Sequence, residues 1–217
     1  KGYETWVDCD AAIIAVSTPE NEDGSCNMSN VYQVIERIKD DVPILIKSTI
    51  SLEGWELIKR AYPKRQITFS PEYLRANHAM EDFKNQKSVS IGGGDTTCWL
   101  RVLSTLSIPV EIKNPEILIL TKYFRNSYLA MKVAFFNQMY DMASEVGLEP
   151  NELLQSVSDD PRIGKSHTYV NADDRGYGGH CFPKDVSALL NTAHTKGVDL
   201  TILSEAMQYN ERLRDES

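Results

Sequence analysis

The sequence predicts an α/β protein in which a partial doubly wound parallel sheet is followed by an all-helical domain. Three observations predict this fold. Short, continuous apolar runs alternate with amphipathic segments through the first half of the chain, which is typical of β-α-β units with buried strands. Small polar residues follow the first three of these runs directly. Beyond Pro115, apolar residues recur at helical spacing through most of the remaining chain.

The first half contains apolar runs with the length of buried strands. They are AAIIAV (11–16), PILIKST (43–49), QITFSPE (66–72), SVSIGGG (88–94) and IPVEIK (108–113). Amphipathic segments at 27–41, 52–63 and 95–107 separate them, and Asp95 is the predicted cap of the last one. Because a strand, helix and strand in sequence form a right-handed parallel unit, residues 1–113 are predicted to form the sheet-containing domain.

The second half, residues 114–217, is predicted to be helical throughout. A long helix follows Pro115 and is closed by Gly147, and Pro150 begins a shorter one. Pro183 lies in the first turn of a third helix that Gly197 ends, an arrangement that both residue types favour. The final amphipathic segment runs to the last residue.

Charge and composition exclude several classes of partner. The formal net charge of -8 and the pI of about 5.1 disfavour a general role on nucleic acid or on anionic membranes. No apolar run approaches the roughly 20 residues of a membrane span. The four cysteines (9, 26, 98 and 181) lack the C-x-x-C spacing of a metal site. We therefore expect free thiols in a reducing, cytoplasmic compartment, with no metal.

Small hydroxyl residues, serine and threonine, lie at the carboxyl ends of the first three predicted strands. These strands continue into Ser17-Thr18-Pro19, Ser48-Thr49 and Ser70-Pro71-Glu72. Ligands of open parallel sheets bind beyond the carboxyl ends of the strands, where small hydroxyl residues let a ligand approach the backbone. The alternative is that serine, threonine and proline merely punctuate strand exits.

The stretch GYGGHCFPKD places Cys181 among glycines, just before a predicted helix. Its thiol is a small apolar filler, a metal ligand or a nucleophile. Exposed N–H groups and the positive end of the helix dipole favour a thiolate there, and Lys184 adds positive charge. Because the glycines leave room for a substrate, the nucleophile is the favoured interpretation. Asp185 either caps the helix or handles protons.

Lys122 and Asn126 are four residues apart and share one face of the long predicted helix. The row continues through Leu129 and Val133, which are apolar. Lys122 and Asn126 therefore either point into a functional site or lie at a helix end where this face turns toward solvent. The spacing favours neither alternative.

Several of these segments resemble the UDP-glucose/GDP-mannose dehydrogenase family. AVSTPENEDGS, IKSTI, SPEYLR, TKYFRNSYLAMKVAFFN, DPRIG and GYGGHCFPKD are similar to the family's motifs in order and spacing. The resemblance implies a Rossmann-like NAD-binding domain, a central helical dimerisation domain and a homodimer. It also implies oxidation of a nucleotide-sugar alcohol to an acid, with NAD as cofactor, in polysaccharide biosynthesis. The C-F-P-K-D context fits UDP-glucose or GDP-mannose better than N-acetylmannosamine, and UDP-glucose is preferred.

The same resemblance assigns roles to individual residues. The catalytic roles fall on Cys181, Lys122, Asn126, Asp185, Thr49 and Glu72. Thr18, Thr49 and Lys184 are the implied NAD contacts. The implied substrate contacts are Glu72, Tyr73, Leu74, Arg75, Arg162, Tyr177, Gly178 and Gly179.

The chain departs from the family's pattern in three places. Ala76 stands where the family has a glutamate that is a proposed base. No G-x-G-x-x-G motif and no second, nucleotide-sugar-binding domain occur in the 217 residues. Without the glycine-rich helix start that holds a pyrophosphate, NAD affinity is expected to be weak. The alternative function is a catalytically incomplete relative that acts as a dimerising or binding module.

Overall fold

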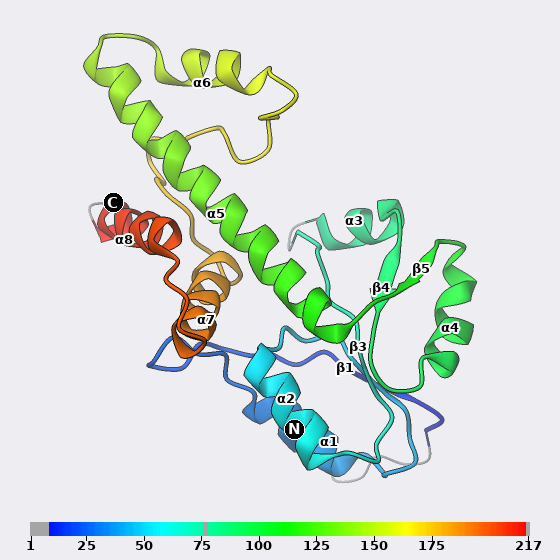
Figure 1. Ribbon diagram of the computed structural model, residues 1–217. Coiled ribbons are helices and arrows are strands. Elements are labelled where there is room, and N and C mark those ends of the chain that lie inside the picture. Colours follow the sequence, from blue (N-terminus) through cyan, green and yellow to red (C-terminus); the bar gives the residue numbers. More distant parts are fainter. Residues whose placement is uncertain (1–8, 76–77, 216–217) are drawn as a thin grey trace. The chain divides into compact units, whose positions relative to one another are not determined.

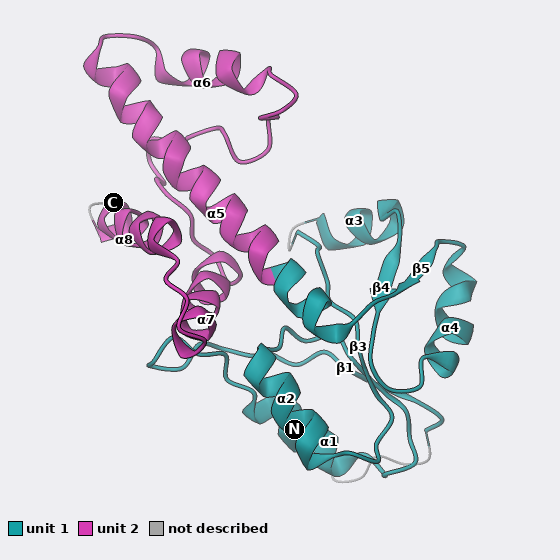
Figure 2. Cartoon of the chain, viewed as in Figure 1, with its two compact units in different colours: residues 1–122 teal, residues 123–217 magenta. Residues whose placement is uncertain are grey.

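The computed structural model describes residues 9–75 and 78–215. The chain divides into two compact units, residues 1–122 and 123–217, and Figure 2 colours them separately. The division falls within a long helix, a few residues beyond the boundary at 113 that the sequence pattern indicates.

Unit 1 contains a parallel sheet of three strands in the order β1-β2-β3. The strands are β1 (Ala12–Ile14), β2 (Ile44–Ile46) and β3 (Ile67–Phe69). Helices α1 (Ser29–Arg37) and α2 (Leu52–Ala61) form the two crossovers (Figure 1). All residues of β2 and β3 are buried. For β2, which is the central strand and is apolar at every position, this is expected.

A second parallel pair completes unit 1. Strands β4 (Val89–Ile91) and β5 (Val110–Ile112) pair with each other, and α4 (Thr97–Leu103) connects them with a short turn, η2 (Ser104–Leu106). Trp99 of α4 packs on this pair. The two sheets meet at an antiparallel bridge between Phe69 and Gly92, where a side chain at position 92 would press on the backbone of Lys113.

One helix of unit 1 has no counterpart in the sequence prediction. Helix α3 (Ala79–Asn85) is short, and none of its residues is buried. Its seven residues are fewer than the roughly 11 or more over which helical apolar spacing can be recognised in a sequence. The predicted cap of α4 is displaced by one residue: Asp95 Oδ1 accepts from Thr97 N at 2.9 Å, and Thr96 is the residue at the N-cap.

The remaining helices are α5 (Pro115–Glu145), α6 (Pro150–Ser158), α7 (Phe182–Thr195) and α8 (Thr201–Asp215). The helix-ending roles of Gly147 and Gly197 are confirmed, because both adopt the left-handed backbone conformation that glycine favours. Phe136, Leu154 and Val170 form a buried cluster in unit 2. Within the described ranges, no helix has the length and apolar character that crossing a bilayer requires.

Candidate active site

In unit 1, two lysines converge on Glu72 at the carboxyl ends of β2 and β3. Lys47 pairs with the Glu72 carboxylate, and its Nζ donates to Ser70 Oγ at 2.9 Å. Lys122, on the first part of α5, donates to the backbone carbonyl of Glu72 at 2.6 Å. Both cations and the carboxylate are partly exposed. The ends of two strands and the start of a helix thus build a small charged cluster.

Lys47 is a residue of this cluster that the sequence analysis missed. Burial lowers its pKa, and the Glu72 carboxylate opposes that shift. Two features of the sequence point to Lys47: it lies in IKSTI, one of the segments that resemble a family motif, and it is a charged residue in the otherwise apolar run that forms β2.

The loops beyond β1 and β2 carry the predicted hydroxyl residues. Thr18 is buried, with 5% of its surface exposed, and Thr49 is half-buried. Ser48 Oγ accepts from Val16 N at 2.8 Å and ties the two loops together. Cys26 Sγ lies 3.8 Å from the Thr49 carbonyl oxygen. The strand ends therefore lie together, as the parallel arrangement requires.

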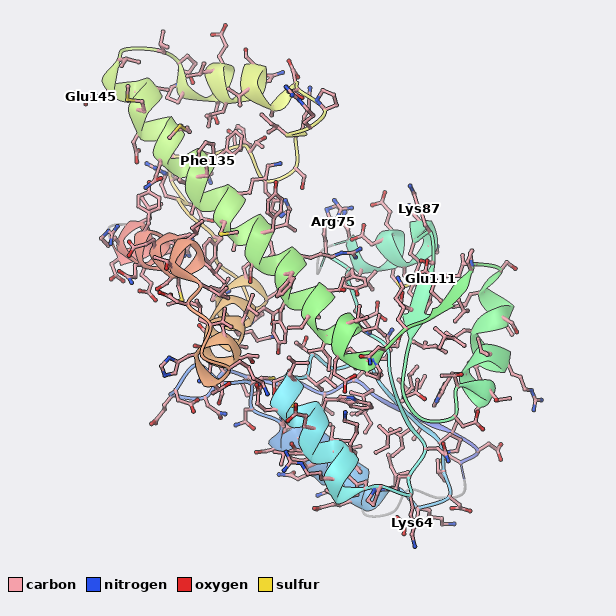
Figure 3. All side chains as sticks on the ribbon, viewed as in Figure 1. Lys64, Arg75, Lys87, Glu111, Phe135 and Glu145 are labelled. Carbon is pink, nitrogen blue, oxygen red and sulfur yellow. The ribbon has the colours of Figure 1, made fainter. Side chains whose placement is uncertain are left out.

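Beyond Glu72, the predicted substrate-contact segment is largely on the surface. Tyr73 is 39% exposed and Leu74 is half-buried. Arg75, labelled in Figure 3, makes a two-pronged pair with Asp82, with a closest N–O distance of 2.6 Å. The hydrogen bonds from Arg75 lower the pKa of Asp82 to about 2. Ala76 lies outside the described residues.

In unit 2, Cys181 is the exposed N-cap residue of α7. Asp185 N donates to the Cys181 carbonyl oxygen at 3.0 Å, which closes the first turn of the helix. The Asp185 side chain is fully buried. Asn126 Nδ2, from α5, donates to Asp185 Oδ2 at 2.5 Å, and Lys184 pairs with the other carboxylate oxygen. Within this unit, the residues predicted to be catalytic therefore meet at the start of one helix.

The glycine segment before Cys181 contains a buried aromatic ring. Tyr177 is 4% exposed, and its hydroxyl has no hydrogen-bond partner among the described residues. Its ring meets the Phe182 ring edge-on at 6.2 Å between centroids. Gly178 is half-buried and Gly179 is exposed. The ring thus lies beneath the turn that leads to Cys181.

Replacing Tyr177 by phenylalanine is expected to remove part of the alkaline loss of stability. Burial raises the pKa of Tyr177 to about 12, whereas an unfolded tyrosine titrates near 10. Between these values the unfolded state binds fewer protons, so stability falls as pH rises through this window. At pH 11 the ionisation costs about 1 kcal/mol, which urea unfolding of the variant at pH 8 and pH 11 measures. An equal alkaline loss in variant and wild type would contradict this assignment.

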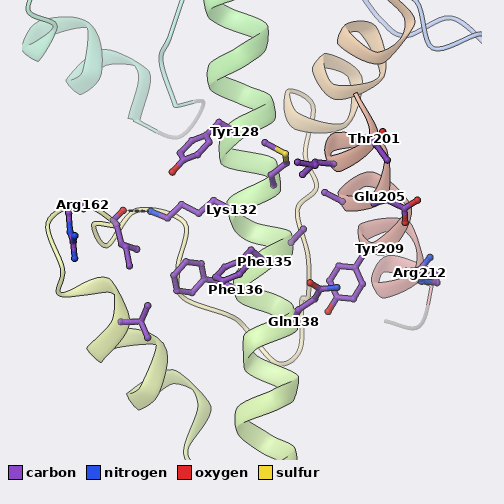
Figure 4. Close-up of a pocket in the computed structure, with 16 residues that line it drawn as sticks. Tyr128, Lys132, Phe135, Phe136, Gln138, Arg162, Thr201, Glu205, Tyr209 and Arg212 are labelled. Carbon is purple, nitrogen blue, oxygen red and sulfur yellow. Dashed lines mark hydrogen bonds between the residues drawn. The ribbon is translucent and has the colours of Figure 1, made fainter. Parts of the chain in front are cut away.

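Arg162 lies in the loop after α6, and its side chain is 87% exposed and paired with Asp160. It lines a pocket of about 770 Å³ in unit 2, between α5, α8 and this loop (Figure 4). Lys132 Nζ donates to the carbonyl oxygens of Ile163 and Gly164 at 2.8 and 3.0 Å and fastens the loop to α5. The walls of the pocket are mostly apolar side chains, among them Phe135 and Ile202.

Comparison with known proteins identifies the family. Residues 2–108 match the NAD-binding domain of the UDP-glucose/GDP-mannose dehydrogenase family, and residues 119–212 match its central domain. The chain belongs to this family. The two matched domains follow the division of the chain into a sheet-containing part and a helical part.

Individual relatives agree with this assignment. The chain is 30% identical to the UDP-glucose 6-dehydrogenase of Pseudomonas aeruginosa and 32% identical to that of Rickettsia typhi, over 98% and 93% of its own length. These matches cover 51% and 49% of the relatives. The structure of a UDP-glucose dehydrogenase from Pyrobaculum islandicum is similar, with a TM-score of 0.82 and 28% identity over 93% of this chain and 50% of that one. The chain thus spans about half the length of the relatives it matches.

NAD is the cofactor that the matched N-terminal domain indicates. The strand ends of unit 1 fit such a ligand in part, because Thr18, Ser48 and Thr49 bring small hydroxyl groups to the carboxyl edge of a parallel sheet. The glycine-rich helix start that holds a pyrophosphate has no matching sequence in the 217 residues.

Proposed function

We propose that this family member oxidises the C6 alcohol of a nucleotide sugar to the acid, with Cys181 as the nucleophile. The hydrogen bond from Asn126 to the buried Asp185, at the start of the helix that Cys181 caps, is the observation that carries the proposal. It joins an amide and a carboxylate at the first turn of the helix whose N-cap residue is the exposed Cys181. Covalent catalysis by a thiol needs groups of these types.

The chemistry follows from the reactivity of a thiol toward carbonyl groups. The substrate alcohol loses a hydride from its carbon and a proton from its oxygen, and so becomes an aldehyde. Cys181 Sγ then adds to the aldehyde carbon and gives a thiohemiacetal, which becomes a thioester when it loses a hydride from carbon and a proton from its hydroxyl group. Water cleaves the thioester, releasing the acid and the free thiol. NAD, when bound, supplies the hydride acceptor for both oxidations.

Asn126 and Lys122 are the proposed donors to the oxygen that becomes negative when sulfur adds to the aldehyde. Fixed donors at such an oxygen are worth several kcal/mol in a site without water. Asn126 is oriented by its hydrogen bond to Asp185, and Lys122 by the carbonyl of Glu72. The two lie four residues apart on α5, as their sequence spacing predicted.

Asp185 and Thr49 are proposed to position the water that hydrolyses the thioester, and Glu72 to hold the sugar or handle protons. Asp185 already orients Asn126 and Lys184 through its two carboxylate oxygens. Thr18, Thr49 and Lys184 are the proposed contacts to NAD. The proposed contacts to the nucleotide sugar are Glu72, Tyr73, Leu74, Arg75, Arg162, Tyr177, Gly178 and Gly179.

UDP-glucose is the proposed substrate, and GDP-mannose is the alternative. The relatives from Pseudomonas aeruginosa and Rickettsia typhi are UDP-glucose 6-dehydrogenases, and the sequence C-F-P-K-D around Cys181 supports the same choice.

A homodimer is part of the proposal. Large apolar side chains on α5 are more than half exposed, and Ile202 of α8 is 80% exposed. Those on the part of α5 that belongs to unit 2 are Phe124, Tyr128, Phe135 and Met142. Together with the apolar pocket of Figure 4, they form a surface of the kind that protein partners cover. The helical domain of the family dimerises, so a second copy of the chain is the proposed occupant.

Product analysis tests the proposed function. The protein is mixed with NAD and either UDP-glucose or GDP-mannose, and NADH and the sugar product are measured. We expect the uronic acid and two NADH per sugar, with faster turnover of UDP-glucose. Protein that binds NAD but oxidises neither sugar would contradict the proposal.

The second candidate function is a dimerising or binding module without catalysis. Ala76, at the position of a glutamate in the family's pattern, favours it. Calorimetry at millimolar NAD, together with sedimentation, separates the two candidates. A stable dimer that neither binds NAD nor oxidises a sugar would support the module.

A further inference from the structure

The segment ahead of Cys181 is held by two buried asparagines that the sequence analysis did not single out. Asn137 lies on α5 and Asn210 on α8, and they are 2% and 5% exposed. Both bind residues 175–177, at the end of the connection that leads from α6 to α7 (Figure 1). All of these residues belong to unit 2.

Asn210 binds both polar groups of the Tyr177 backbone. Tyr177 N donates to Asn210 Oδ1 at 2.6 Å, and Asn210 Nδ2 donates to the Tyr177 carbonyl oxygen at 3.0 Å. The side-chain amide therefore acts as a neighbouring strand would, and it uses its donor and its acceptor at once. These two buried hydrogen bonds fix the backbone on both sides of Tyr177, because a buried N–H or carbonyl group without a hydrogen-bond partner would destabilise the fold.

Asn137 holds the two residues before Tyr177. Its Oδ1 accepts from Arg175 Nε at 2.7 Å and from Gly176 N at 3.3 Å. Its own Nδ2 donates to Val133 O at 2.9 Å, which fixes the orientation of the amide on α5. Arg175 in addition pairs with Asp141 at 2.8 Å. The segment is thus fastened to two different helices over three consecutive residues.

The fit around the glycines is close. Gly176 has a positive φ of 78°, and a Cβ there would lie 2.5 Å from Asn210 Oδ1. A Cβ at Gly178 would lie 3.3 Å from the Arg214 guanidinium carbon. At position 176, only glycine both adopts a positive φ without strain and has no Cβ to clash with Asn210. These contacts therefore fix the position of the backbone at the start of the turn that leads to Cys181.

Cys181 consequently lies between two anchors. Four residues before it, Tyr177 is held by Asn210. Four residues after it, Asp185 is held by Asn126. Because a reacting atom displaced by about 1 Å loses much of its rate, both anchors bear on where the sulfur lies.

We propose that Asn137 and Asn210 are positioning residues for Cys181, a role that rests on the function proposed for that thiol. Neither touches the reacting atoms. They fix the backbone of residues 175–177, and this fixed backbone sets the place from which the sulfur meets the aldehyde carbon.

The test compares Asn210→Ala and Asn137→Ala with a matched control, Asn151→Ala. Asn151 holds Val170 through the same pair of bonds, from Val170 N to Oδ1 at 3.2 Å and from Nδ2 to Val170 O at 3.0 Å. The control thus removes an equivalent contact elsewhere in unit 2. Amide hydrogen exchange and the products of NAD-dependent sugar oxidation are measured for each protein.

In the exchange arm, Asn210→Ala and Asn137→Ala are expected to speed exchange of the amides of residues 176–181 by about tenfold or more. The control is expected to do so only near Val170. Unchanged exchange at 176–181 in both variants would overturn the proposal. If a variant does not fold, the wild type still decides: rapid exchange of the Tyr177 amide would show that Asn210 does not hold it.

In the product arm, the ratio of free aldehyde to acid is expected to rise about tenfold in both variants, with hydroxylamine used to trap the aldehyde. The first oxidation does not need the thiol, so a loss of folded protein lowers both products together and leaves the ratio unchanged. Wild-type protein that forms no acid overturns the proposed function. Wild-type acid formation with an unchanged ratio in both variants overturns the positioning role alone.

Discussion

Replacing Cys181 by serine is expected to lower acid formation by at least about 10³-fold, because a hydroxyl adds to carbonyls and leaves acyl groups far less readily than a thiolate. The aldehyde should still form, since the first oxidation involves no covalent bond to sulfur. Time courses of NADH and of trapped aldehyde measure the two steps separately. The expected signature is one NADH per sugar in place of two.

Cys9→Ser is the matched control for this experiment. Cys9 is also an exposed thiol, and it lies just before β1 in unit 1. It is expected to leave both products unchanged. Acid formation by Cys181→Ser at the wild-type rate would remove the thiol from the mechanism.

Replacing Asp185 by alanine is expected to reduce both stability and activity. The carboxylate is fully buried, it accepts from Asn126, and it pairs with the partly exposed Lys184. Without it, two polar groups lose their partner, and the free energy of unfolding should fall by about 2–4 kcal/mol. Acid formation should fall on the order of 10²-fold, because Asn126 is no longer held toward the developing oxyanion. Urea unfolding and steady-state kinetics measure these effects.

Two further variants separate charge from position at this site. Asp185→Asn keeps an oxygen that accepts from Asn126, so it should recover part of the lost stability while acid formation stays low. Asp159→Ala removes a surface carboxylate paired with Lys165, both more than half exposed, and should alter stability only slightly. If Asp185→Ala were no less stable than Asp159→Ala, the buried pair would have no structural role.

The elements that the sequence predicts are those set by local chemistry. β2 is apolar at every position and buried at every position, as is typical of a strand covered on both faces of a parallel sheet. Pro183 and Gly197 mark the two ends of α7. The proline ring fixes φ at a value that suits the first turn of a helix, and glycine adopts the left-handed conformation that ends one, whatever residues surround them. The place of Cys181 at the helix start follows from Pro183 alone.

The features that the sequence does not predict depend on contacts between distant residues. Asn210 is one polar residue on an amphipathic helix, and nothing in its surroundings in the sequence indicates that it binds Tyr177, far away in the chain. Lys47 similarly gains its role from Glu72, which lies just beyond the end of the next strand, β3. The long helix α5 carries apolar residues on several faces, so the pattern does not tell the buried Phe136 from the exposed Phe135.

The central claim is that the substrate becomes covalently bound to the sulfur of Cys181. Acid quenching during turnover of UDP-glucose and NAD, followed by mass spectrometry of the peptide that contains Cys181, tests it most directly. A mass increase of one glucuronyl nucleotide is expected on Cys181, absent without NAD and absent from Cys9. Steady acid formation with an unmodified Cys181 at every quenching time would contradict it.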